Sequence, residues 1–145
     1  MLWHMVVTLD TDVVVSAVVS STGASRFLLR EIGLGRLIAA ASVPLLLECE
    51  AVLKGPETLR RAGGTVADME VILDQLAATL RPVPIWYLWR PLLRGANDDM
   101  VLEAAANAAV TDLVTSDIRD FGTAPSRFGI ELCRPADLAR SLRDG

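Results

Sequence analysis

Near its N-terminus the chain reads Met5-Val-Val-Thr-Leu9, followed directly by Asp10. This short run is apolar and rich in β-branched residues, which predicts a buried strand. The next run, residues 12–19, is almost as apolar. Its residue types favour a strand, but a helix capped near Asp10 fits equally well, and propensity alone does not decide between them. In either case a carboxylate stands at the end of a buried strand.

Outward from this strand, helical and extended patterns alternate along the chain. Further strands are expected at residues 37–41, 113–115 and 129–133, and helices at 26–33, 45–53, 65–80, 99–109 and 135–142. Asn97 or Asp98 is expected to cap the helix of residues 99–109. Such alternation implies a mostly parallel sheet covered on both faces. In such sheets functional groups collect beyond the carboxyl ends of the strands.

Composition is that of a compact globular protein. The chain has 145 residues, of which 52% are hydrophobic and 22% charged, and this predicts one α/β domain over residues 1–145. No apolar run reaches the roughly 20 residues that a bilayer requires, so no membrane partner is expected. The N-terminus lacks the features of a secretory signal. Cys49 and Cys133 have no metal-ligand spacing, and a cytoplasmic location is therefore expected.

The net charge of −4 argues against a protein that holds nucleic acid by bulk electrostatics. A nucleic-acid function would have to act through metal ions and a local basic rim. The single histidine, His4, precedes the first strand, so histidine-based zinc or triad chemistry has little support.

Four acidic residues form the candidate site: Asp10, Glu48, Asp99 and Asp117. Asp10 and Asp117 follow predicted strands, and Asp99 begins a predicted helix. Glu48 interrupts an apolar helix face, which is costly unless the carboxylate has a cation or a hydrogen-bond partner. Converging carboxylates indicate a hard cation, Mg²⁺ or Mn²⁺. Two such ions about 4 Å apart can activate water against a phosphodiester.

Each acid also has a purely structural interpretation. Helix capping would explain Asp10 or Asp12, and complementarity to a helix dipole would explain Asp98 with Asp99. A surface ion pair with Lys54 or an arginine would explain Glu48. Turn initiation would explain Asp117. The joint placement favours a functional interpretation, because caps have no reason to converge. If the acids do converge, at least one of them should have a raised pKa.

Five segments, in this order, resemble those of the PIN-domain family: residues 6–17, 23–29, 42–53, 97–106 and 112–117. The first resembles a strand followed by Asp-Thr-Asn and a helix with Ser-Ala. The second, Gly23-Ala-Ser-Arg-Phe-Leu-Leu29, is similar to a subgroup of toxin components of toxin–antitoxin systems, the VapC-like proteins. Asn97-Asp-Asp-Met-Val-Leu-Glu-Ala-Ala-Ala106 resembles the Asp-Asp-x-x-Leu-x-x-Ala signature. Asp12 stands where the family usually has Asn, and Ser116 replaces the more usual Gly or Arg.

The resemblance implies a three-layer α/β/α sandwich around a parallel sheet of four or five strands. It also implies Mg²⁺- or Mn²⁺-dependent cleavage of RNA, a homodimer, and an antitoxin partner that blocks the acidic groove. Asp10, Asp99 and Asp117 would be the main metal ligands, Asp98 a second candidate beside Asp99, and Glu48 would complete the pocket. The surrounding groups that would support these ligands are Asp12, Ser16, Asp98, Thr115 and Ser116. The candidates for a rim that contacts RNA are Arg26, Arg30, Arg90, Arg94 and Arg119.

Two other hypotheses remain open at this stage. A catalytically silent PIN-like module could bind a protein partner through the apolar residues Trp86, Trp89 and Leu92. A flavodoxin-like phosphotransfer receiver would also hold Mg²⁺ in an acidic pocket, but it requires a lysine at the end of a late strand. The only lysine is Lys54, which lies in the wrong region.

Overall fold

The computed structural model describes residues 5–86 and 96–144 of the chain. A five-stranded sheet in the order β3-β2-β1-β4-β5 forms the middle layer, and every neighbouring pair of strands is parallel. The strands are β1 (Val6–Leu9), β2 (Ile38–Ala41), β3 (Arg81–Pro82), β4 (Asp112–Val114) and β5 (Glu131–Cys133). The structure therefore confirms the predicted α/β class and the parallel sheet.

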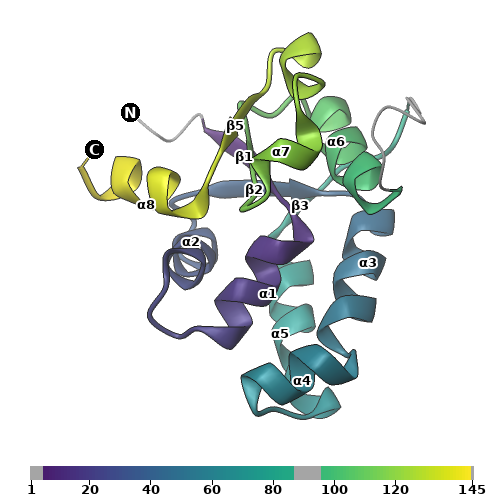
Figure 1. Cartoon of the computed structure of the whole chain (residues 1–145), viewed down its shortest axis with the longest axis vertical. Helices are drawn as coiled ribbons and strands as arrows, with labels where there is room; N and C mark the ends of the chain where they lie inside the picture. Colours follow the sequence, from purple (N-terminus) through teal and green to yellow (C-terminus); the bar gives the residue numbers. More distant parts are fainter. Residues whose placement is uncertain (1–4, 87–95, 145) are drawn as a thin grey trace.

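Helices cover both faces of this sheet, with α6 and α7 on one side and α1, α2 and α5 on the other (Figure 1). The helices are α1 (Thr11–Val19), α2 (Ala24–Gly33), α3 (Val43–Leu53), α4 (Pro56–Ala62), α5 (Val66–Thr79), α6 (Ala96–Ala108), α7 (Ile118–Phe121) and α8 (Pro135–Asp144), with a 3₁₀ helix at Pro125–Phe128. The arrangement is the three-layer α/β/α sandwich expected from the sequence.

The strand order places a topological switch point between β1 and β4. The chain proceeds from β1 through β2 to β3 at one edge, and then returns to the other side of β1 to form β4 and β5. Open α/β sheets bind ligands beyond the carboxyl ends of the strands at such a point. The order also differs from the 2-1-3-4-5 order of flavodoxin-like folds, which excludes the receiver hypothesis.

Packing decides the ambiguity of residues 12–19 in favour of a helix. Val13, Val14 and Ala17 of α1 are buried, a spacing that fits one face of a helix against the sheet. Other helix starts follow local capping rules. The Ser42 hydroxyl accepts a hydrogen bond from the Leu45 N–H at 3.2 Å at the start of α3.

Two predicted boundaries are wrong. Helix α6 begins at Ala96, so residues 97 and 98 lie inside its first turn and not at its cap position. No helix was predicted between the helices of residues 45–53 and 65–80, but the segment after Gly55 forms helix α4, with Pro56 at its start and Gly63 in the left-handed conformation (φ 65°) at its end. Helix α4 matters because it borders the candidate site.

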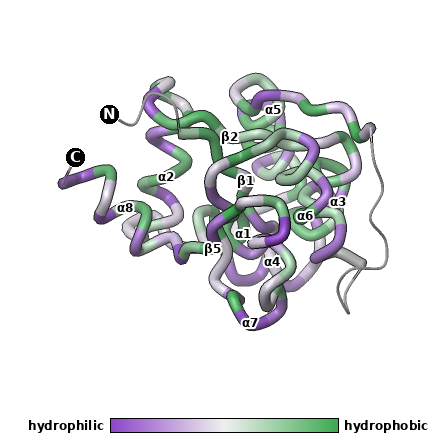
Figure 2. The backbone as a smooth tube through the Cα atoms, turned by 90° about the horizontal axis from the view of Figure 1, so that it is seen from above, coloured by the Kyte–Doolittle hydropathy of each residue, from purple (hydrophilic) through white to green (hydrophobic). Residues whose placement is uncertain are grey.

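Two apolar clusters lie on opposite faces of the sheet, one around Leu28 and Leu53 and the other around Leu102 and Phe121. Figure 2 shows the hydrophobic residues of β1 and β2 near the centre and mixed polarity along the peripheral helix α8.

Within the described residues no single helix is long and apolar enough to cross a membrane; the pair α1 and α2 reaches that length and composition only jointly, across a bend of 100°.

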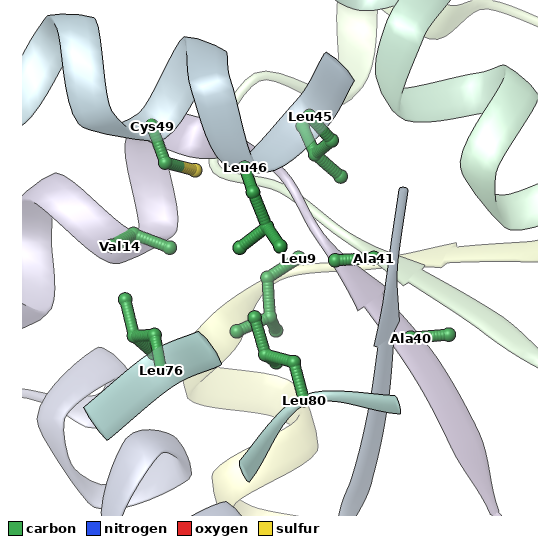
Figure 3. A pocket seen from close by; sticks show the side chains of 9 residues that line it. All are labelled: Leu9, Val14, Ala40, Ala41, Leu45, Leu46, Cys49, Leu76 and Leu80. Atoms are coloured by element: carbon green, nitrogen blue, oxygen red, sulfur yellow. The ribbon is translucent and has the colours of Figure 1, made fainter. Parts of the chain in front are cut away.

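A small apolar cavity of about 20 Å³ lies against the sheet, close to the carboxyl end of β1. Figure 3 shows the side chains that surround it: Leu9, Val14, Ala40, Ala41, Leu45, Leu46, Cys49, Leu76 and Leu80. The volume would admit one water, but the lining offers almost no polar partners, so the cavity is expected to be dry. The residue after Leu9 is Asp10, whose carboxylate thus stands at the border of an apolar core.

Candidate functional site

An open cleft lies at the carboxyl ends of β1 and β4, at the switch point. The residues that line it are Asp10, Thr11, Asp12, Val15, Ser16, Glu48, Val52, Arg61, Asp98, Ser116, Asp117 and Asp120. Six of these residues are acids, and they come from the end of β1, from α1, α3 and α6, and from the segment after β4. The fold therefore gathers acids that are up to about a hundred residues apart in the chain.

Thr115 connects the two strand-end acids. Its Oγ1 donates a hydrogen bond to Asp10 Oδ2 at 2.8 Å and accepts one from the Asp117 backbone N–H at 3.0 Å. Thr115 is fully buried, and Asp10 is only 9% exposed. The hydroxyl therefore holds the Asp10 carboxylate in one orientation.

Asp12 has one satisfied and one unsatisfied oxygen. Its Oδ2 accepts a hydrogen bond from the Ser116 N–H at 3.2 Å. Its Oδ1 is buried and has no hydrogen-bond partner among the described residues. Leaving such an oxygen unpaired is costly, by about 1–3 kcal/mol or more for a charged group. A cation in the cleft would remove this cost.

The acids of the cleft raise one another's pKa values. Burial, and then the neighbouring Asp12 carboxylate, raise the pKa of Asp10 from 3.8 to about 6, although the Thr115 hydrogen bond opposes the shift. Burial is also the largest cause that raises the pKa values of Asp12 and Asp98, with Asp117 among the other causes for both. The prediction that at least one of these acids has a raised pKa is confirmed, with burial as the largest cause and neighbouring carboxylates adding to it.

Glu48 lines the cleft from α3. The surface ion-pair alternative with Lys54 is wrong, because the Lys54 ammonium lies 3.4 Å from both Glu50 and Glu70 instead. Ser16, Ser116 and Asp117 also line the cleft. The Asp10 and Asp117 side chains make no capping hydrogen bond at the starts of α1 and α7.

Asp98 and Asp99 have different surroundings. Asp98 lines the cleft, and the charges of Asp10 and Asp117 contribute to its raised pKa. Asp99 is 4% exposed and is not among the residues that line the cleft. Successive helix residues point about 100° apart, so the two adjacent acids have different neighbours. Of the two candidates named from the sequence, Asp98 lines the cleft and Asp99 is buried in α6.

The side chains suit a hard divalent cation by their chemistry. Within the described residues, no group of three acidic, histidine or cysteine side chains already surrounds one point at ligand distances. Mg²⁺ usually takes only one or two carboxylates and completes its octahedron with water and phosphate oxygens. A cleft with several carboxylates, crowded negative charge and the unpaired Asp12 Oδ1 fits such an ion.

None of the arginines predicted to form a basic rim lines the cleft in the part of the chain that the structure describes. Arg26 donates hydrogen bonds to the Ala17 and Val18 carbonyls, at 2.6 and 3.5 Å, near the end of α1. Arg30 and Arg119 are exposed but do not line the cleft. Arg90 and Arg94 lie outside the described residues.

Two charged residues that line the cleft, Arg61 and Asp120, were not placed in the site from the sequence. Arg61 lies on α4, a helix that the sequence analysis did not predict. Asp120 follows Asp117 by one turn of α7, and a hydrogen bond with Asp117 is the largest cause of its raised pKa. The three-residue spacing from Asp117 was the available signal for Asp120.

Comparison with known proteins adds a family and a structural neighbour. The sequence model of the PIN domain matches residues 6–119. No curated protein matches the sequence. Among solved structures, this chain is similar to a chain in the crystal structure of VapBC2 from Rickettsia felis, which is bound to a DNA fragment from its own promoter. The TM-score is 0.60 and the sequence identity is 19%. The alignment covers 90% of this chain and 98% of that one, and at this identity it shows a common fold.

Proposed function

The chain belongs to the PIN-domain family, and we propose that it is a metal-dependent endoribonuclease that acts in the cytoplasm as the toxin of a toxin–antitoxin pair. The observation that carries this proposal is the gathering of acids from distant segments into one cleft at the switch point of the sheet. Helix caps or surface ion pairs would not require such a gathering.

In this mechanism Asp10, Asp117 and an acid of the first turn of α6 would hold Mg²⁺ or Mn²⁺. The bound ion would supply a Lewis acid that polarises the phosphate and makes water a better nucleophile. Thr115 holds the Asp10 carboxylate in place through the 2.8 Å hydrogen bond. Glu48 completes the pocket from α3, directly or through water.

The test is cleavage of a set of single-stranded and hairpin RNAs by the purified protein with Mg²⁺, with Mn²⁺ and with EDTA. We expect cleavage with either metal, and none with EDTA or with the Asp10→Asn variant. Glu50→Gln is the matched control for Glu48→Gln, because Glu50 is exposed on the same helix and does not line the cleft. Undiminished cleavage by Asp10→Asn would exclude this mechanism.

The two acids of α6 can be separated in the same assay. We expect Asp98→Asn to weaken metal binding, since Asp98 faces the cleft. Family resemblance assigns the catalytic position to Asp99 instead, and the buried position of Asp99 predicts that Asp99→Asn lowers stability as well as activity. The metal concentration that gives half-maximal rate, measured beside thermal unfolding, distinguishes a ligand from a structural role.

An antitoxin partner and a homodimer are part of the proposal. The similarity of fold to a chain of the VapBC2 structure supports the partner in general terms. Co-purification with the product of an adjacent small reading frame, and inhibition of cleavage by that product, would test it. Light scattering of the protein alone would test the homodimer.

A silent protein-binding module is the second candidate, favoured by one observation. The Trp86 side chain is 76% exposed, which is unusual for tryptophan. Trp89 and Leu92, named with it in the sequence analysis, lie outside the described residues. Calorimetry distinguishes the two candidates, because the silent module predicts no Mn²⁺ binding at the acidic cleft.

A further inference from the structure

One arginine stands inside the acidic cleft. Helix α3 ends at Leu53, and the Gly55-Pro56 pair lets the chain turn into α4, which packs against α1 and α3. Thr58 of α4 is buried, whereas Arg61 is exposed and lines the cleft. Arg61 is the only basic residue among the described residues that line it.

In the described part of the chain, Arg61 forms no ion pair with the acids that line the cleft beside it. Among the described residues, no carboxylate lies within 4.0 Å of the Arg61 guanidinium, although six acids line the same cleft. By contrast, the Arg36 guanidinium does form an ion pair, with Glu31 at 2.6 Å. The guanidinium of Arg61 therefore remains available for an external anion.

A second hollow adjoins the cleft at this position. Its lining consists of Val15, Val52, Gly55, Pro56, Glu57, Thr58 and Arg61. Val15, Val52 and Arg61 line both spaces, so the hollow continues the acidic cleft. Its volume is about 330 Å³, and apart from Arg61, Glu57 and Thr58 its lining is apolar or backbone. The aliphatic walls offer a surface to an uncharged ring, and Arg61 stands between the two spaces.

We propose that Arg61 binds a backbone phosphate next to the one that is cleaved, and that the hollow beside α4 receives the flanking nucleotide of single-stranded RNA. This inference rests on the proposed ribonuclease function. A polyanion that enters a cleft with six acids needs positive charge beyond the metal. A guanidinium binds phosphate through two parallel hydrogen bonds, whereas the Glu57 carboxylate in the lining of the hollow disfavours a second phosphate there.

The experiment compares wild type, Arg61→Gln and Arg60→Gln with Mn²⁺ and a short RNA that the wild type cleaves. Arg60 is the matched control, because it is exposed on the same helix but lines neither space. We expect Arg61→Gln to raise KM about tenfold with little change in kcat. It should also reduce the slope of log KM against log salt by about 0.7, the value for one phosphate contact on a single strand.

A scan of single methylphosphonate substitutions then identifies the phosphate. At one position next to the cleaved bond, the neutral linkage should raise the KM of the wild type about as much as Arg61→Gln does. The same linkage should not raise the KM of the Arg61→Gln variant any further. Equal KM values for the Arg61 and Arg60 variants would overturn the assignment. So would methylphosphonates that raise the KM of the wild type and of Arg61→Gln by the same factor at every position. A fall in kcat alone would also overturn it. Failure of the wild type to cleave any RNA would instead overturn the proposed function, and this assignment with it.

Discussion

Replacing Asp10 by asparagine should stabilise the metal-free protein near neutral pH. The Asp10 carboxylate is 9% exposed and close to other acids, and its pKa is raised from 3.8 to about 6. Asparagine keeps an oxygen that can accept the 2.8 Å hydrogen bond from Thr115, but it carries no charge. The substitution therefore removes repulsion and retains the main contact.

The magnitude follows from the pKa difference. A rise in the Asp10 pKa from 3.8 to about 6 means that the ionised carboxylate destabilises the folded state by at most about 3 kcal/mol, at 1.36 kcal/mol for each pKa unit. Relaxation around the cleft lowers this value, so Asp10→Asn should raise the free energy of unfolding by about 1–3 kcal/mol. Because the folded state holds its proton up to a higher pH than the unfolded state, the free energy of unfolding falls as the pH rises from about 4 to about 6. The stabilisation by Asp10→Asn should be largest above pH 7 and vanish near pH 3.

The assay is urea denaturation of wild type, Asp10→Asn and the control Asp74→Asn, each in EDTA and in Mn²⁺ at pH 4 and pH 8. Asp74 is exposed on α5, so its substitution should change stability by less than about 0.5 kcal/mol. In EDTA at pH 8, Asp10→Asn should be the most stable protein. Mn²⁺ should stabilise the wild type and reverse that order, because binding to the folded state adds stability. If Asp10→Asn is less stable than wild type in EDTA at pH 8, the reasoning is refuted.

Three further predictions concern single side chains. Thr115→Val removes the hydroxyl that orients Asp10, and should lower metal affinity about 10- to 100-fold with the fold retained, as measured by calorimetry; unchanged affinity would contradict this. Leu45→Ala enlarges the apolar cavity and should lower the free energy of unfolding by about 2–5 kcal/mol in urea; a loss below about 1 kcal/mol would show that the cavity collapses. Lys54→Ala breaks exposed ion pairs only, and should change stability by less than about 1 kcal/mol and leave RNA cleavage unchanged.

The parts of the fold that depend on local pattern could be predicted from the sequence. The apolar run before Asp10 forms β1, and Ser42 caps α3 as its position before Pro44 suggests. Residues 12–19 could not be assigned, because β-branched residues favour strands locally and only packing of Val13 against the sheet makes them helical. Seven-residue α4 was missed because too few turns are present to show a period.

The candidate site was predictable as a set of acids but not in its details. Asp10 and Asp117 follow strands that meet at one edge, which the strand pattern alone indicates. Which of Asp98 and Asp99 lines the cleft depends on how α6 packs against the sheet, and the sequence pattern does not give this packing. Arg61 reaches the cleft only through the tertiary placement of α4.

The most direct test of a cation in this cleft is anomalous diffraction from a crystal of the wild-type protein soaked in Mn²⁺. We expect an anomalous peak bordered by the carboxylates of Asp10, Asp98 and Asp117, with Asp12 Oδ1 turned towards it or towards its water ligands. A map from saturating Mn²⁺ with no peak between these carboxylates would contradict the metal-dependent mechanism.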